Sequence, residues 1–205
     1  MKDKIKYSFY TLSHPFDGFY TIRYHGEGSV LLATIYISLW IISNVLGHEV
    51  TSFLYNETAL QLIDVRQEIN KILILTILFC LGNWSITTLM EGKGRLRDIY
   101  IVFGYACLPI SLINIPLAFV STWLTYSESI YYNLLIAFGW LWFFFLLFTG
   151  IMTIHQYSLS KMLVTTVLTV IAMLILAFIY LLFFNLISQF ITFMTAIYQE
   201  ISFRI

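Results

Sequence analysis

Charged side chains are scarce in this chain, which has eleven basic and eleven acidic residues among 205 and a formal net charge of zero. An ordinary soluble domain has about 25% charged residues, whereas here the charged share is 11% and the hydrophobic share is 60%. So little charge cannot cover the surface of a water-soluble fold of this size, and the composition favours a protein that crosses a membrane several times. A net charge of zero also gives no electrostatic field that would attract nucleic acid.

Proline and cysteine are scarce as well. Three prolines exclude a Pro-rich linker or tail. The two cysteines, Cys80 and Cys107, lie within apolar runs that bring no further ligand residues, which argues against a disulfide or a cysteine-based metal site and favours two small buried hydrophobes. No apolar stretch directly follows the charged first ten residues, so a cleavable signal peptide is not expected.

Long apolar runs are what the sequence has in abundance. Five of them approach or exceed the roughly 20 residues that span the hydrocarbon, and they cover residues 29–46, 71–90, 99–124, 132–153 and 162–184. None carries a charge in its middle, and none alternates with the period of two that barrel strands show. We therefore predict an all-α, polytopic membrane helix bundle with five transmembrane helices. It forms one domain over residues 1–205, with a cytoplasmic segment at 1–28 and the bundle at 29–205.

Two segments outside these runs are predicted to form amphipathic helices. In residues 15–25, Pro15 suits a first helical turn, and four aromatic side chains recur at helical spacing, namely Phe16, Phe19, Tyr20 and Tyr24. Such an aromatic face belongs at the level of the lipid headgroups, so an interfacial helix is expected before the first span, with Ser29 as the cap of that span. The loop at 47–70 mixes apolar and acidic residues, and we expect a short helix leading into the second span.

Basic residues are shared unequally between the two predicted sides of the membrane. The side of the N-terminus has eight, and the other side has three, namely Arg66, Lys71 and Arg204. Because short cytoplasmic loops carry an excess of Lys and Arg, the N-terminus is predicted to be cytoplasmic. Five crossings then place the C-terminus outside.

The last apolar run continues beyond one bilayer thickness without Gly or Pro. Polar residues then recur on one helical face, at Asn185, Ser188, Gln189, Thr192, Thr195 and Gln199. We predict an extended last helix. Whether residues 185–200 protrude, lie on the outer interface or pack inside the bundle stays open at this point.

Three stretches of the chain resemble a known family. "HPFDGFY", "LMEGKGRLRDIYIVFGYACLP" and "IHQYSLSK", together with the five-span layout, are similar to the bacterial branch of the Yip family, the Ypt/Rab GTPase-interacting membrane proteins. The resemblance implies a fold, a topology and a bacterial cytoplasmic membrane, and it implies no catalytic activity. Eukaryotic members act in Golgi and ER trafficking and have a longer cytosolic N-terminal region. Only about 28 residues precede the first span here, so GTPase binding is not carried over to this chain.

The short charged hairpin between spans two and three is a candidate contact site for lipid, anion or partner. Its residues are Gly92, Lys93, Gly94, Arg95 and Arg97. Glycines with exposed N–H groups, a helix N-terminus and two guanidinium groups can bind a phosphate, for which a lipid headgroup is the natural source. The same residues would equally serve as a flexible turn whose basic side chains keep it on the cytoplasmic side. Glu91 and Asp98 are close in sequence and can form ion pairs with these basic side chains.

Two further groups of residues are candidates for function. A cytoplasmic-face polar cluster is made up of His14, Asp17, His25, Glu91 and His155. It has nitrogen and oxygen ligands for a zinc ion but no ligand pair at helical spacing. In the third span, Pro109 and Pro116 each free a backbone carbonyl one turn back, which either kinks the helix or lines a path for a cation.

Three functions are consistent with these observations. The first is a non-enzymatic adaptor, scaffold or accessory subunit for another membrane protein or transport complex, in contact with the lipid bilayer. The second is a permease or a subunit associated with one, and the third is a metal-dependent membrane enzyme built on the polar cluster. We favour the first, with no cofactor, no bound metal and no nucleic-acid partner, and with a homo-oligomer left open.

Overall fold

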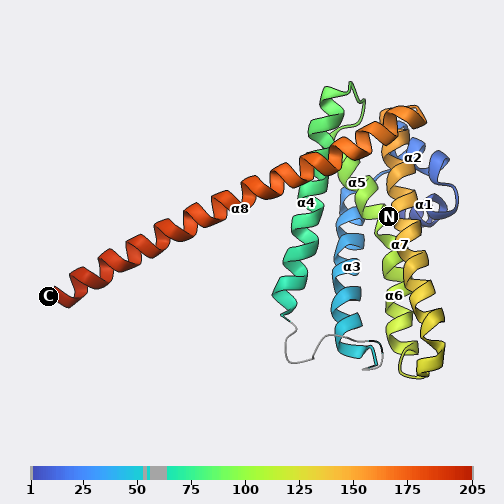
Figure 1. Ribbon diagram of the computed structural model, residues 1–205. Helices are drawn as coiled ribbons and strands as arrows, with labels where there is room; N and C mark the ends of the chain where they lie inside the picture. The colour runs from blue at the N-terminus through green and yellow to red at the C-terminus, as the bar shows by residue number, and fades with distance from the viewer. Residues whose placement is uncertain (1, 53–54, 56–63, 205) are drawn as a thin grey trace.

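A computed structural model describes residues 2–52, 55 and 64–204 of the chain (Figure 1). This part of the chain is helical and contains no strand. Its helices are α1 (Lys2–Ser13), α2 (Pro15–Tyr24), α3 (Val30–Val50), α4 (Val65–Leu89), α5 (Leu96–Ala106), α6 (Leu108–Val120), the short 3₁₀ helix η2 (Tyr126–Glu128), α7 (Ser129–His155) and α8 (Leu159–Arg204). The prediction of an all-α fold is thereby confirmed.

Five helical segments in the described residues are long and apolar enough to cross a membrane, as the sequence predicts. They correspond to α3, α4, the pair α5 and α6, η2 with α7, and α8. Ser29 caps α3, where its side chain accepts a hydrogen bond of 3.4 Å from the backbone N–H of Leu32. Most of the short helix predicted within 47–70 lies outside the described residues.

The third span occupies the centre of the bundle. Of the residues in its 18-residue apolar stretch, 72% are buried, against 33–39% in the corresponding stretches of the first, second and fourth spans. Close approach to α3 depends on Gly104, because a Cβ added there would lie 2.6 Å from the Cα of Ala33. Phe103, which is buried, packs edge-to-face on Phe143 of α7 with 5.9 Å between the ring centroids. The central span therefore connects α3 and α7 through small and aromatic side chains.

The two prolines of the third span have different surroundings. Helix α5 ends at Ala106 and α6 begins at Leu108, so the span is interrupted at Cys107, and the buried Pro109 occupies the first turn of α6. A proline is tolerated there because the first N–H groups of a helix have no partner within the helix. Pro116 lies inside α6 and is exposed on its surface.

The N-terminal segment contains two helices where the sequence predicts one. Helix α2 covers the predicted interfacial helix, and α1 packs against it, with Gly18 so close that a Cβ would lie 2.8 Å from the Cα of Thr11. The prediction that all four aromatic side chains face the lipid headgroups is wrong for Phe19, which is fully buried next to Gly150 of α7. The other three aromatic residues, Phe16, Tyr20 and Tyr24, are exposed as expected.

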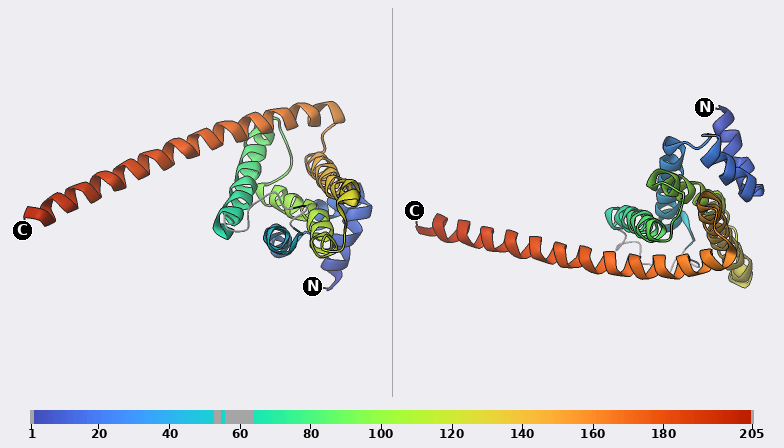
Figure 2. Two further views of the ribbon diagram at one scale, coloured as in Figure 1. Left: turned by 60° about the horizontal axis from the view of Figure 1, so that its bottom comes forward. Right: turned by 90° about the horizontal axis from the view of Figure 1, so that it is seen from above.

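Helix α8 is one continuous helix of 46 residues. It starts beside the end of α7, crosses α4 and then extends away from all other helices, as Figures 1 and 2 show. The first half of α8 contacts α4. There Asn83 Nδ2 of α4 donates a hydrogen bond of 3.1 Å to Thr169 Oγ1 of α8. The extended last helix is thus confirmed. Its polar face does not pack inside the bundle of its own chain, because every side chain from Phe178 to Glu200 is exposed apart from the half-buried Ser188.

Candidate functional site

The turn between α4 and α5, residues 90–95, is the centre of the candidate site, and we call the end of the bundle that carries it the hairpin end. Glu91 has a positive φ of 55°, and the backbone N–H of Gly92 then donates a hydrogen bond of 2.7 Å to the carbonyl of Thr87. These contacts close the end of α4 and reverse the chain within a few residues. The two glycines of the turn, Gly92 and Gly94, are needed because a side chain of helix α7 packs directly against them.

His155, the last residue of α7, is inserted against both glycines. Its side chain is 2% exposed, and its Nδ1 accepts a hydrogen bond of 3.2 Å from the backbone N–H of Gly94. Because Nδ1 is the acceptor, the neutral ring carries its proton on Nε2. A Cβ at Gly94 would lie 2.7 Å from His155 Cε1, and a Cβ at Gly92 would collide with His155 Nδ1. Only glycine at these two positions leaves room for the imidazole.

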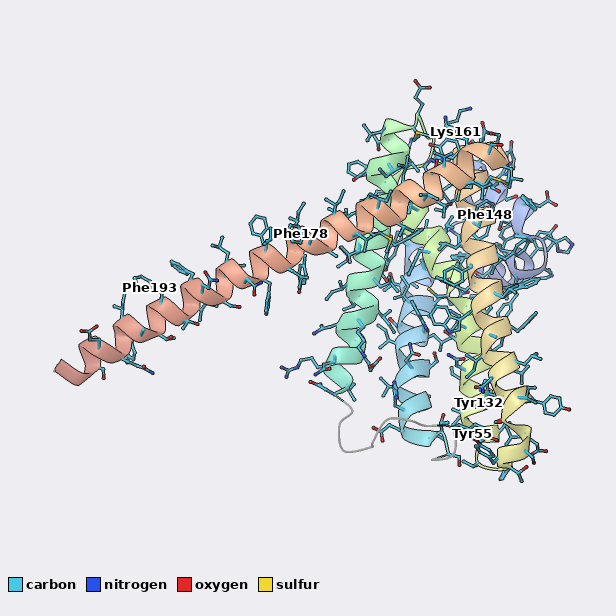
Figure 3. The ribbon with its side chains drawn as sticks, viewed as in Figure 1. Tyr55, Tyr132, Phe148, Lys161, Phe178 and Phe193 are labelled. Carbon is cyan, nitrogen blue, oxygen red and sulfur yellow. The ribbon has the colours of Figure 1, made fainter. Side chains whose placement is uncertain are left out.

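Tyr157 follows in the turn between α7 and α8 and binds the end of α4. Its hydroxyl lies 3.3 Å from the carbonyl oxygen of Thr87 and 3.2 Å from that of Met90, to which it can donate. The ring stacks on His155 with 5.3 Å between centroids. Lys161 Nζ also lies 4.6 Å from the centroid of the Tyr157 ring, and Figure 3 shows Lys161 at this end of α8. Burial, followed by the nearby carboxylate of Glu91, raises the pKa of Tyr157.

An ion pair connects the N-terminal segment to the same turn. Arg23 Nη1 of α2 lies 2.7 Å from Asp98 Oδ2 of α5, and the two side chains are only 17% and 12% exposed. Arg23 Nη2 also donates a hydrogen bond of 2.6 Å to the carbonyl of Lys93. Asp98 Oδ2 in addition accepts a hydrogen bond of 3.0 Å from the backbone N–H of Arg95, so the same carboxylate closes the first turn of α5. α2, the turn and α5 are thereby fixed relative to one another.

The predicted anion site at 92–97 is only partly available in this arrangement. The N–H groups of Gly92, Gly94 and Arg95 are used by Thr87, His155 and Asp98 respectively. Lys93 Nζ donates a hydrogen bond of 2.6 Å to Gln156 Oε1. These three backbone N–H groups are therefore not available to a phosphate. The exposed guanidinium groups of Arg95 and Arg97 are what the turn offers to a ligand or partner.

The predicted polar cluster does not assemble into a metal site in the part of the chain that the structure describes. Groups of three or more His, Cys, Asp or Glu with a suitable geometry are absent there. Of the five cluster residues, His155 is buried, and the others are exposed, namely His14, Asp17, His25 and Glu91. His14 stacks on Tyr10 with 4.6 Å between centroids, at the junction of α1 and α2.

Reasoning from sequence alone missed the role of Arg23 and Tyr157. Arg23 counts in the sequence only as one more basic residue on the side of the N-terminus. Nothing in its neighbourhood reveals that it bonds a residue seventy positions away. Tyr157 lies within "IHQYSLSK", one of the stretches that carry the family resemblance, and this was the available signal. The pairing of Asp98 with a basic residue was expected, although its partner lies in α2 and not in the hairpin.

The described part of the bundle contains cavities, of which two are relevant to function. One, of about 370 Å³, is lined mainly by apolar side chains of α4, α7 and α8, among them Phe79, Phe148 and Met173. The other, of about 360 Å³, lies between α3, α6 and α7 at the end opposite the hairpin, and polar residues such as Ser43, Asn44 and Asn114 line it. Near this end Tyr55 Oη donates a hydrogen bond of 2.6 Å to the carbonyl of Thr125, and Tyr55 packs on Tyr132 (Figure 3).

Comparison with known protein families gives a match over most of the chain. A family model described as the Yip1 domain matches residues 9–182, which include every residue of the hairpin-end contacts. Neither a curated protein nor a solved structure matches the chain significantly.

Proposed function

Because the chain belongs to the Yip1-domain family, we propose that this membrane protein acts without catalysis, as an adaptor or scaffold for another membrane protein or transport complex. One observation carries the proposal. The polar contacts of the hairpin end connect α2, the end of α4, the turn at 90–95, α5 and the end of α7 into one fixed surface. A surface whose helices are fixed relative to one another is suited to binding a partner.

The exposed side chains of this surface are suited to a partner at a membrane. Arg95 and Arg97 supply positive charge, and the exposed rings of Phe16, Tyr20 and Tyr24 lie on α2, which Arg23 joins to the turn and to α5. Aromatic and arginine side chains are enriched where proteins bind one another. We infer that the partner presents acidic groups to the two arginines and apolar side chains to α2.

The proposed orientation places the hairpin end in the cytoplasm of a bacterium. Eight basic residues belong to this side, in α1, α2, the turn, the first turn of α5 and the start of α8, namely Lys2, Lys4, Lys6, Arg23, Lys93, Arg95, Arg97 and Lys161. Three belong to the other side, and short loops rich in Lys and Arg stay in the cytoplasm. The resemblance to the bacterial branch supports the bacterial cytoplasmic membrane as the location. Residues 1–205 are proposed to act as one membrane domain.

Site-specific photo-crosslinking in intact membranes tests the adaptor function. A photoreactive phenylalanine analogue at Tyr20 is expected to give a discrete protein adduct that mass spectrometry identifies. The same analogue at Tyr131, an exposed residue near the opposite end of α7, is the matched control. Charge reversal by Arg95→Glu and Arg97→Glu should remove the Tyr20 adduct. Recovery of the uncrosslinked monomer alone, or of lipid adducts alone, would argue against an adaptor.

A permease, or an accessory subunit of one, is the second candidate, and the polar cavity of about 360 Å³ favours it. The cavity would need a continuation toward the hairpin end. On that route Trp140, which lines both cavities, packs edge-to-face on Trp40 with 6.0 Å between centroids, and the other cavity is lined mainly by apolar side chains. We therefore expect purified protein in liposomes to transport no sugar, ion or lipid. Measurable flux of any of these would favour the permease over the adaptor.

A further inference from the structure

The second half of α8 has no partner in its own chain. We call residues 178–200 the arm. Figure 1 shows the arm extending beyond α4 with no other helix beside it, and Figure 3 shows Phe178 and Phe193 on it as projecting side chains. Its large apolar side chains, from Phe178 to Tyr198, are exposed. At about 1.5 Å per residue the arm alone is about 35 Å long, comparable with the hydrocarbon thickness of about 30 Å.

One face of the arm is polar and differs from the rest of it. Its residues recur three or four positions apart, and in order they are Asn185, Ser188, Gln189, Thr192, Thr195 and Gln199. Thr192 and Thr195 donate hydrogen bonds of 2.9 and 2.8 Å to carbonyls of their own helix. Asn185 and Gln189 have no hydrogen-bond partner within the described residues, and both are exposed. The arm therefore presents these two carboxamides without a partner within a long apolar helix.

This polar face is unlike that of a helix lying at the membrane surface. Interfacial helices have a strongly charged polar face, typically rich in Lys and Arg. Here no charged residue occurs between Lys161 and Glu200. A stripe of hydroxyl and carboxamide groups without charge is instead typical of helices that associate inside the bilayer, where such groups form hydrogen bonds between helices. Leaving a carboxamide unpaired in hydrocarbon would cost free energy.

We infer that the arm binds the arm of a second copy of this chain, through the polar face of 185–199. Each Asn and Gln carboxamide has both donors and an acceptor, so two identical stripes can satisfy one another. A second copy brings its stripe to the same depth of the membrane, which an unrelated helix need not do. A two-fold axis between the copies gives a closed contact in which the same face is used on both sides. The inference is independent of the adaptor function, because the arm and the hairpin end are different surfaces.

Disulfide crosslinking in native membranes tests this contact. With both native cysteines replaced by alanine, Ser188→Cys and Thr192→Cys on the polar face are expected to give a disulfide-linked dimer on oxidation. Phe190→Cys and Met194→Cys lie about half a turn away on the same helix and serve as matched controls that stay monomeric. Equal crosslinking of both pairs would overturn the proposal. So would reaction of positions 188 and 192 with a membrane-impermeant maleimide without crosslinking, since the stripe would then face water.

A second measurement examines the energetics of the contact in the full chain. Replacing the two carboxamides together, by Asn185→Leu and Gln189→Leu, should weaken dimerisation in mild detergent about tenfold, as two interhelical hydrogen-bonding side chains would. The matched variant carries Phe183→Leu and Phe190→Leu on the opposite face and should keep the dimer. Light scattering coupled to size-exclusion chromatography gives the mass. An unchanged dimer in the first variant, or a monomeric unmodified chain, would refute the contact. Neither result bears on a hetero-partner crosslinked through Tyr20.

Discussion

Arg23 of α2 and Asp98 of α5 form an ion pair of 2.7 Å that connects the N-terminal segment to the central span. Both side chains are largely buried, and each makes a further hydrogen bond to the backbone of the turn at 90–95. A pair in these surroundings stabilises the arrangement only while both partners are present, because a single remaining charge would be buried without compensation. The hairpin end therefore depends on Arg23 and Asp98 together.

Asp98→Asn should destabilise the protein by about 3 kcal/mol, in line with the loss of one partner of a buried ion pair. The amide keeps the shape of the side chain and can still accept the hydrogen bond from Arg95, so the change removes mainly the charge. Thermal unfolding in detergent, followed by tryptophan fluorescence, measures the effect. Asp17→Asn removes the same charge from an exposed position of α2 and should leave the unfolding temperature unchanged. Equal shifts in the two variants would mean that the ion pair contributes nothing specific.

Gly94→Ala should destabilise the protein through a steric conflict with His155. A Cβ at this position would lie 2.7 Å from two atoms of the buried imidazole, and relieving such overpacking costs about 1–3 kcal/mol. The Gly94 N–H bond to His155 Nδ1 would lengthen as the turn moves. Gly47→Ala is the matched control, because nothing lies within 4 Å of the added Cβ. A Gly94→Ala variant as stable as the Gly47→Ala variant would contradict the placement of His155.

Tyr157→Phe should cost about 1 kcal/mol at neutral pH, the usual net value of a lost hydrogen bond. Burial raises the pKa of Tyr157, so folding favours its protonated form. That contribution is complete below the pKa of about 10 of an unfolded-state tyrosine, and it decreases as the pH rises above that value. The stability difference between the unmodified chain and Tyr157→Phe should therefore shrink above about pH 10.

The pH series for Tyr157 needs a control for other tyrosines that ionise in the same range. Tyr126→Phe provides it, because Tyr126 is 74% exposed. Unfolding temperatures at pH 7 and at about pH 10.5 are compared for the three chains. A difference between Tyr157→Phe and the unmodified chain that widens at the higher pH would contradict the direction of the pKa shift.

The five spans could be predicted from the sequence because hydrocarbon imposes a simple condition on each of them. About 20 apolar residues without a central charge satisfy that condition locally, so α3, α4 and α7 are found with small errors at their ends. Helix α1 was missed because it is neither long nor strongly apolar, and its order depends on contact with α2. The burial of Phe19 was missed for a similar reason, since Gly150 that accommodates it lies in α7.

The candidate site could be predicted only in part, because its contacts join segments far apart in the chain. The sequence singled out the turn at 92–97 and His155 separately. It gave no indication that His155 accepts a hydrogen bond from Gly94, 61 positions away. The glycines were interpreted as a source of free N–H groups for an anion, whereas their missing side chains make space for an imidazole. Local spacing predicts helix faces well and says little about which distant residue fills a turn.

The contact between α4 and the first half of α8 allows a last prediction, which concerns the side-chain hydrogen bond between Asn83 and Thr169. Asn83 is 2% exposed and donates to Thr169 Oγ1 at 3.1 Å, while its Oδ1 has no partner in the described residues. Thr169→Val keeps the volume of the side chain but leaves the whole carboxamide unpaired. We expect a loss of about 1 kcal/mol, as for other interhelical hydrogen bonds in membranes. Thermal unfolding measures it, and Thr88→Val is the control, because exposed Thr88 bonds only to its own helix. If the two valine variants unfold at the same temperature, the Asn83–Thr169 bond does not hold α8 against α4, and the direction in which the arm leaves the bundle must depend on the apolar contacts of Gly82 with Met173.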